Sequence, residues 1–155
     1  MAATFANINP NITSGIVYAS DVALTATESD LGTAFVLSGF DSGINAEIQL
    51  VIAGGPSGNT GSYVVLQTSW DGTTWFDVAW ATTSSTTNST LRWQLNINNY
   101  VASAVTAQTR AAGTSPGATG VGGGLIGGYI RFAGFSGLTG GSIKATVKYI
   151  LQPLR

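Results

Sequence analysis

The chain has 155 residues, of which 44% are apolar and only 8% are charged, and its net charge at pH 7 is −1. A chain of this length forms one domain and buries roughly 70% of its unfolded surface, so its core needs no disulfide or metal, and it contains no cysteine and no histidine. Because it has neither a Lys/Arg cluster nor a long apolar run, we expect it to bind no nucleic acid and to cross no membrane.

The charged residues are sorted along the sequence. All seven acidic residues lie at positions 21–77, and all six basic residues lie at positions 92–155. An ordinary domain is about one quarter charged and mixes the two signs. The scarcity of charge predicts a subunit whose surface is covered by other subunits. The sorting has two interpretations, pairing between the halves of one chain or pairing across subunits.

Residues 1–14 are polar and offer few apolar anchors, which predicts an extended N-terminal arm. They lack the basic start and apolar stretch of a secretory signal, so we expect synthesis in a cytoplasm. Residues 15–155 are expected to form a single domain. In an assembly the arm would order on a neighbouring subunit, with Phe5 and Ile8 as its apolar contacts.

The apolar residues of the domain recur with a period of two, which predicts strands, whereas a helical stripe is hard to find. The first strands in chain order are two weak ones at residues 15–27 and 33–37 and a clear one at residues 44–52. In the clear strand, apolar side chains such as Ile48 face one way and polar ones such as Glu47 face the other. This alternation predicts one buried face and one wet face.

A hairpin is predicted next, because residues 63–70 and 74–80 are rich in β-forming residues and the dipeptide Asp71-Gly72 separates them. Asp71 is expected to cap the turn with its side chain. Large aromatic residues beside and beyond the turn are expected to fill the core: Trp70, Trp75, Trp93 and Phe132.

The later elements are a clear strand at residues 91–97, a short helical insertion around residues 101–110, a weak strand at 129–135 and a clear strand at 143–151. The total is about eight strands separated by turn signals. We therefore predict an all-β fold, an antiparallel β-sandwich or jelly roll with a core about 10 Å thick.

Residues 111–128 do not fit a minimal sandwich, because they are nearly all Gly, Ala, Thr and Ser. A long loop without secondary structure in a compact domain is usually functional or disordered. We expect it, like the N-terminal arm, to order on a neighbouring subunit, with Leu125 and Ile126 as apolar contacts. The alternative is a mobile loop without a role.

Candidate catalytic groups are few. Without histidine or cysteine, a serine nucleophile lacks its commonest base. Two carboxylates could act as acid and base in a glycoside-processing enzyme, and Asp71 and Asp77 are the candidate pair. We favour a structural interpretation, in which Asp71 caps the turn and Asp77 lies on the outward side of its strand.

Candidate binding sites for ions and cofactors are weak as well. Glu28 and Asp30, with Asp21 or Asp41, could offer oxygens to calcium, but no loop-ligand spacing supports such a site. The glycines at residues 120–124 lack the Lys-Ser/Thr ending of a phosphate-binding loop. We therefore predict no catalytic residues, no metal and no cofactor, and expect that the protein is not an enzyme.

Four tryptophans offer one further possibility. Exposed indole rings stack on the apolar faces of sugars, so the four could form a carbohydrate-binding platform. Core packing is favoured, because large aromatic residues dominate β-sandwich cores. The residues are Trp70, Trp75, Trp80 and Trp93.

The hairpin at residues 64–78, with its Ser69-Trp70-Asp71-Gly72-Thr73-Thr74-Trp75 turn, and the late segments 128–132 and 140–147 resemble the β-sandwich modules of tailed-phage virion proteins. The resemblance covers about residues 44–151 in outline and is sharpest in the hairpin. A chain of this size without enzyme residues is most similar to a capsid decoration, or cement, protein.

This resemblance implies that the protein binds the outer surface of a phage capsid, clamps neighbouring major capsid proteins and stabilises the shell. It also implies self-association, typically as a homotrimer, and a location on the virion exterior after synthesis in the host cytoplasm. Two alternatives remain, a tail, baseplate or fibre component of the virion and a carbohydrate-binding β-sandwich module.

Overall fold

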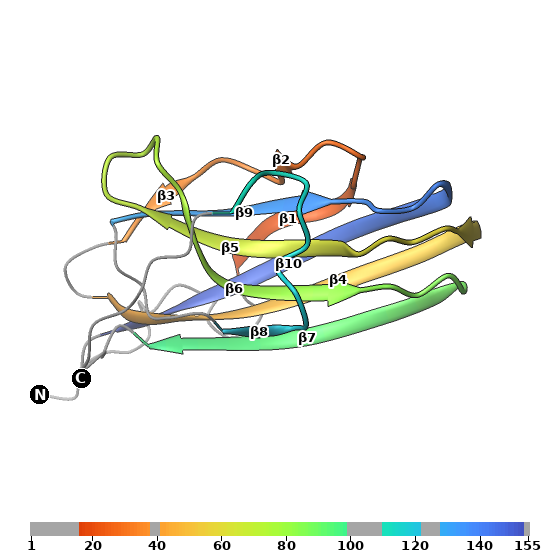
Figure 1. The fold of residues 1–155 in the computed structure, drawn as a ribbon. Helices are drawn as coiled ribbons and strands as arrows, with labels where there is room; N and C mark the ends of the chain where they lie inside the picture. The colour runs from red at the N-terminus through yellow and green to blue at the C-terminus, as the bar shows by residue number, and fades with distance from the viewer. Residues whose placement is uncertain (1–15, 38–40, 99–109, 122–127, 154–155) are drawn as a thin grey trace, which may run out of the picture.

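The computed structural model describes residues 16–37, 41–98, 110–121 and 128–153. All regular structure in these residues is β, and it forms two antiparallel sheets that face each other (Figure 1), so the predicted all-β sandwich is confirmed. The strands are β1 (Ile16–Ala23), β2 (Ser29–Asp30), β3 (Phe35–Val36), β4 (Asp41–Ser57), β5 (Ser62–Ser69), β6 (Phe76–Thr83), β7 (Ser89–Asn98), β8 (Gly120–Val121), β9 (Tyr129–Phe135) and β10 (Gly140–Pro153). Some predictions concern residues outside the described ranges: the arm at 1–14, nearly all of the helix at 101–110, and the contacts Phe5, Ile8, Leu125 and Ile126.

The two layers differ in how they are built. Sheet A has the order β1-β10-β4-β7, and its strands are long. Sheet B has the order β2-β9-β5-β6-β8, and β3 also pairs with β9, at a different part of that strand from β2. Seven strands therefore carry most of the sandwich, and three strands of two residues each border sheet B.

The core lies between the sheets, and its largest contribution comes from the alternation in β4. Ile44, Ile48 and Ile52 are fully buried, and the register with β10 sets Ile143 opposite Ile52 and Val147 opposite Ile48. Apolar rows therefore face apolar rows along the whole of sheet A. Since complete burial of an aliphatic side chain contributes about 1.5–3 kcal/mol, these rows supply much of the stability.

The aromatic core differs from the prediction. Phe132 is fully buried as expected, but Trp70 is 72% exposed. The reason is local, because β5 ends at Ser69, so Trp70 belongs to the turn and no longer follows the strand alternation. The core aromatics are instead joined around Tyr18, whose ring centroid lies 4.9 Å from that of Phe132.

The predicted hairpin is present, but its turn is longer than two residues. Thr68 pairs with Phe76, so the residues between them form a loop. The Asp71 carboxylate accepts hydrogen bonds from the backbone amides of Thr73 (2.8 Å) and Thr74 (2.7 Å), and these bonds lower the pKa of its carboxyl. Gly72 follows with φ of 74°. Asp71 therefore has the capping role that the sequence predicted.

At the opposite end of the sandwich, β10 starts with a bulge against the end of β4. Gly141 has φ of 80°, and a Cβ atom there would lie 2.7 Å from Pro56 Cα and 2.9 Å from the Ala53 carbonyl oxygen. Gly55 has a similar φ of 72°, yet a Cβ atom there would meet no atom within 4 Å. A side chain at Gly55 would therefore meet backbone strain alone, whereas one at Gly141 would meet both strain and steric crowding.

We expect Gly55→Ala to lower the free energy of unfolding by about 1–2 kcal/mol, the cost of a left-handed backbone for a residue with a side chain. Gly141→Ala should cost about 1–3 kcal/mol more, because its methyl group also collides with backbone. Chemical denaturation of both variants measures the difference. Equal losses would contradict the crowding at Gly141.

Candidate functional site

β5 is buried on both faces, which is unusual for a strand in a two-layer sandwich. Val64 and Leu66 face the core, whereas Tyr63 and Val65 belong to a second apolar cluster with Trp80. This second cluster lies on the outer face of sheet B. Residues 110–121, which we call the strap, cover it (teal in Figure 1).

The strap is bonded to β6 along much of its length. The Trp80 indole N–H donates to the Ala118 carbonyl oxygen (2.6 Å), and the Thr82 hydroxyl donates to the Gly117 carbonyl oxygen (2.9 Å). β8, at the end of the strap, pairs with β6. Residues 111–121, predicted as part of a long loop, therefore pack on the chain's own sheet and end in β8. The packing of this segment on sheet B could not be predicted from the sequence, because its small residues show no periodic apolar pattern.

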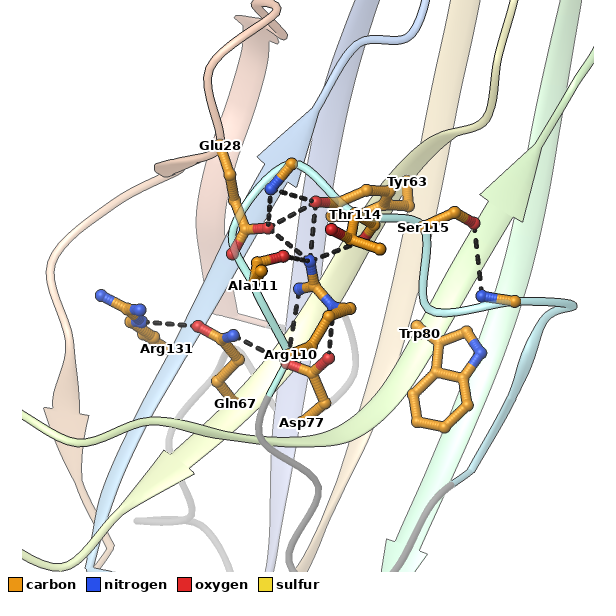
Figure 2. Close-up of polar contacts among 12 residues, drawn as sticks. Glu28, Tyr63, Gln67, Asp77, Trp80, Arg110, Ala111, Thr114, Ser115 and Arg131 are labelled. Carbon is orange, nitrogen blue, oxygen red and sulfur yellow. Dashed lines mark hydrogen bonds and ion pairs between the residues drawn. The ribbon is translucent and has the colours of Figure 1, made fainter.

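Arg110, the first residue of the strap, has a side chain that is only 10% exposed. Its NH1 donates to Glu28 Oε2 (2.8 Å) and to Tyr63 Oη (2.8 Å), and its Nε donates to Asp77 Oδ2 (2.6 Å). NH1 also donates to the carbonyl oxygen of Thr114 (2.7 Å). Figure 2 shows the guanidinium between Asp77 on one side and Glu28 and Tyr63 on the other. Arg110 therefore fastens the strap to sheet B.

The network continues across sheet B. Gln67 Nε2 donates to Asp77 Oδ1 (2.7 Å), and Arg131 Nε donates to Gln67 Oε1 (2.8 Å). Arg131 also pairs with Asp30 (2.8 Å), and its guanidinium lies 4.1 Å from the ring centroid of Trp75. We call the following residues the polar network: Asp30, Arg131, Gln67, Asp77, Arg110, Glu28 and Tyr63.

A β-bulge explains why Asp77 joins this network. Leu66 pairs with Ala79, but the next residue, Gln67, pairs with Asp77, so Val78 is an extra residue in β6. The bulge brings Asp77 and Trp80 to the same outer face, although they are three residues apart. The outward side predicted for Asp77 is therefore correct, but its side chain is only 4% exposed, because the strap covers it.

The polar network shifts the pKa values of Glu28 and Tyr63. Burial alone would raise the pKa of Glu28, but hydrogen bonds from Arg110 and Tyr63 and the charge of Arg110 hold that pKa below its usual value of 4.5. Burial and the hydrogen bond to Glu28 raise the pKa of the Tyr63 phenol above its usual range. Near neutral pH, Glu28 is therefore ionised, and Tyr63 keeps its proton and donates a hydrogen bond to the Glu28 carboxylate.

The acidic residues considered from the sequence are not brought together. Asp71 lies in an exposed loop, whereas Asp77 is buried beneath the strap, so the candidate acid–base pair is separated. Three of the four calcium candidates are each bound to a different base, Asp21 to Lys144, Glu28 to Arg110 and Asp30 to Arg131. Within the described residues, no group of three His, Cys, Asp or Glu side chains is placed to hold a metal ion.

The polar network holds the strap against sheet B. In the described part of the chain, every buried side-chain nitrogen and oxygen atom has a hydrogen-bond partner. The network residues Arg110 and Tyr63 did not stand out in the sequence, and Glu28 was considered there only as a calcium candidate. One available signal was the spacing of Asp77 and Trp80, which breaks the alternation of β6 and marks a bulge.

Arg110→Met should lower the free energy of unfolding by about 3–5 kcal/mol, because it leaves the Glu28 and Asp77 carboxylates buried without their cation. Lys148→Met, which removes an exposed charge, is the control and should cost less than about 1 kcal/mol. Urea denaturation at pH 7 measures both. Similar small losses in the two variants would contradict the role of Arg110.

Protonation of Glu28 at acidic pH should lower the free energy of unfolding. A carboxyl with a lowered pKa in the folded state stabilises the fold fully above its unfolded-state pKa, and this stabilisation is lost as the pH falls through the folded-state value. We therefore expect the unfolding free energy to decrease below about pH 4.5 and Glu28→Gln to show a shallower decrease. Parallel pH profiles of the two proteins would be inconsistent with this linkage.

The part of the chain that the structure describes contains no helix long and apolar enough to cross a membrane. Comparison of the chain with protein-family models, with curated proteins and with solved structures found no match in any of the three.

Proposed function

We propose that the chain is a structural protein of a tailed-phage virion that binds the outer surface of the capsid and stabilises it, as a decoration protein. The observation that carries this proposal is the internal use of its charged side chains. Arg110, Glu28 and Asp77 are buried and bonded to one another, so they serve the fold. Such a use suits a protein whose task is to be packed against others, and we propose no catalytic activity and no cofactor.

The outer face of sheet A supports this role. On β4 and β7, this face exposes the amide side chains of Asn45, Gln94 and Asn96 together with Arg92, and the exposed Lys144 and Lys148 of β10 lie beside them. Burial of an amide in a contact costs less than burial of an ionised group, and its hydrogen bonds can be replaced by those of a partner. A partner such as the major capsid protein, or a second copy of the chain, could therefore cover this face at a modest cost of desolvation.

One end of sheet B offers apolar contact surface. Val36 pairs with Tyr129, and Tyr129 pairs with Ser69, which is followed by the exposed Trp70. Val36, Tyr129 and Trp70 are all exposed and therefore lie near one another at this end. Exposed aromatic side chains are frequent anchors of protein–protein contacts. We propose this end as a contact with the major capsid protein.

Trp70 also favours the second candidate function, carbohydrate binding. That interpretation requires an exposed indole ring, and Trp70 is the tryptophan that meets the requirement, whereas Trp80 is buried and bonded to the strap. A single exposed ring beside Tyr129 could stack on one sugar unit. A virion protein of the tail, baseplate or fibre would share the same fold and differ in its partner.

Capsids that lack the protein should bind the purified chain and then rupture at a higher temperature. Trp70→Ala should weaken this binding about tenfold, as expected for the loss of an aromatic anchor. Thr86→Ala, in an exposed turn at the opposite end of the sandwich, is the control. Electron microscopy and thermal rupture assays measure both effects.

Absence of binding together with an unchanged rupture temperature would reject the decoration role. Binding to a glycan array that Trp70→Ala abolishes would then support the carbohydrate-binding alternative. Labelling of purified virions at the tail would support the tail, baseplate or fibre alternative.

A further inference from the structure

The sandwich has four sheet edges, and three of them are unsuited to pairing with another strand. In sheet B, the edges are formed by β2 and β3 on one side and β8 on the other, each of two residues. In sheet A, β1 has two register shifts, and Asp21 within it has φ of 55°. Very short strands and bulges are the usual means by which proteins prevent edge pairing.

The fourth edge, β7, lacks these features. It pairs with β4 through ten successive residue pairs, from Ser89 to Asn98, without a register shift. It contains no proline and no glycine, and in the described residues its other side forms no ladder. Since a strand directs alternate N–H and C=O groups to each side, about half of the polar backbone groups of β7 lie on this open side.

The side chains of β7 also suit a further strand. Its inner row begins with Leu91 and Trp93, which pack at the margin of the core and are only half-buried. Its outer row is Arg92, Gln94 and Asn96, all exposed, with a single charge. A strand added beside β7 would cover the two apolar side chains and would meet a row consisting largely of amides.

We propose that β7 pairs antiparallel with β7 of a second copy of the chain, so that the two four-stranded A sheets become one continuous sheet around a two-fold axis. Apolar rows face apolar rows in every register that sets a residue opposite its own copy. The two such registers that pair the most residues of β7 place residue 93 opposite 93 or residue 94 opposite 94. In both registers Leu91 and Trp93 face apolar partners, and Arg92 faces Gln94 or Asn96 and never another Arg92. The edge is therefore complementary to itself, as an isologous contact requires.

This pairing differs from the homotrimer implied by the resemblance, and it does not depend on capsid binding. It concerns the purified chain alone. A decoration protein could be confirmed while the pairing fails, and the pairing could be confirmed while capsid binding fails.

Gln94→Lys tests the pairing. In the single chain, position 94 lies opposite Glu47, so the introduced lysine is tolerated. In the pair, it faces either its own copy or Arg92, and like charges opposite each other weaken the contact. We expect the dissociation constant to rise about tenfold. Asn45→Lys adds the same charge to the same face but on β4, an interior strand, and should leave the pair intact.

Analytical ultracentrifugation should give a mass of two chains for the unmodified protein and for Asn45→Lys, and a shift towards one chain for Gln94→Lys. In the unmodified protein, amide hydrogen exchange in β7 should also slow as the concentration rises. A single-chain mass, an oligomer that Gln94→Lys leaves intact, equal dissociation of both variants, or concentration-independent exchange in β7 would each overturn the proposal.

Discussion

The ion pairs of Arg110 with Glu28 and Asp77 determine where the strap lies, and much of sheet B depends on that position. A buried arginine must be matched by acceptors, because an unpaired charge in a protein interior costs several kcal/mol. The two carboxylates come from different segments, one beside β2 and one in β6. The guanidinium can satisfy both only with the strap against the outer face of β5.

The same requirement explains the sorting of charge along the sequence. Each described ion pair joins an early acidic residue to a late basic residue: Asp21 to Lys144, Glu28 to Arg110, Asp77 to Arg110 and Asp30 to Arg131. For these residues the pairing lies within one chain, as the first of the two interpretations of the sorting proposed. Seven of the 13 charged residues take part in these ion pairs, and three of them, Arg110, Glu28 and Asp77, are buried.

The sequence predicted those parts of the fold that depend on alternation. The strands at residues 44–52 and 129–135 were recognised because each side chain's face follows from its position in a regular strand. The exposure of Trp70 and the burial of Asp77 were not predicted, because a turn and a bulge interrupt that rule. Strands of two residues and the strap carry no period at all. The positions of these short strands and of the strap are set by their contacts with the longer strands of sheet B.

The strand order of sheet A has a consequence for how the chain folds. β10, the last described strand, lies between β1 and β4 and pairs with both. During synthesis, β1 and β4 are therefore made long before the strand that joins them, and sheet A cannot close until residues 140–153 arrive. The two waiting strands contain Asp21, Asp41 and Glu47 and no basic residue. The lysines Lys144 and Lys148 arrive with β10 itself, and Lys144 then forms an ion pair with Asp21 of β1, so the strand that completes the sheet also brings charges opposite to those of its neighbours.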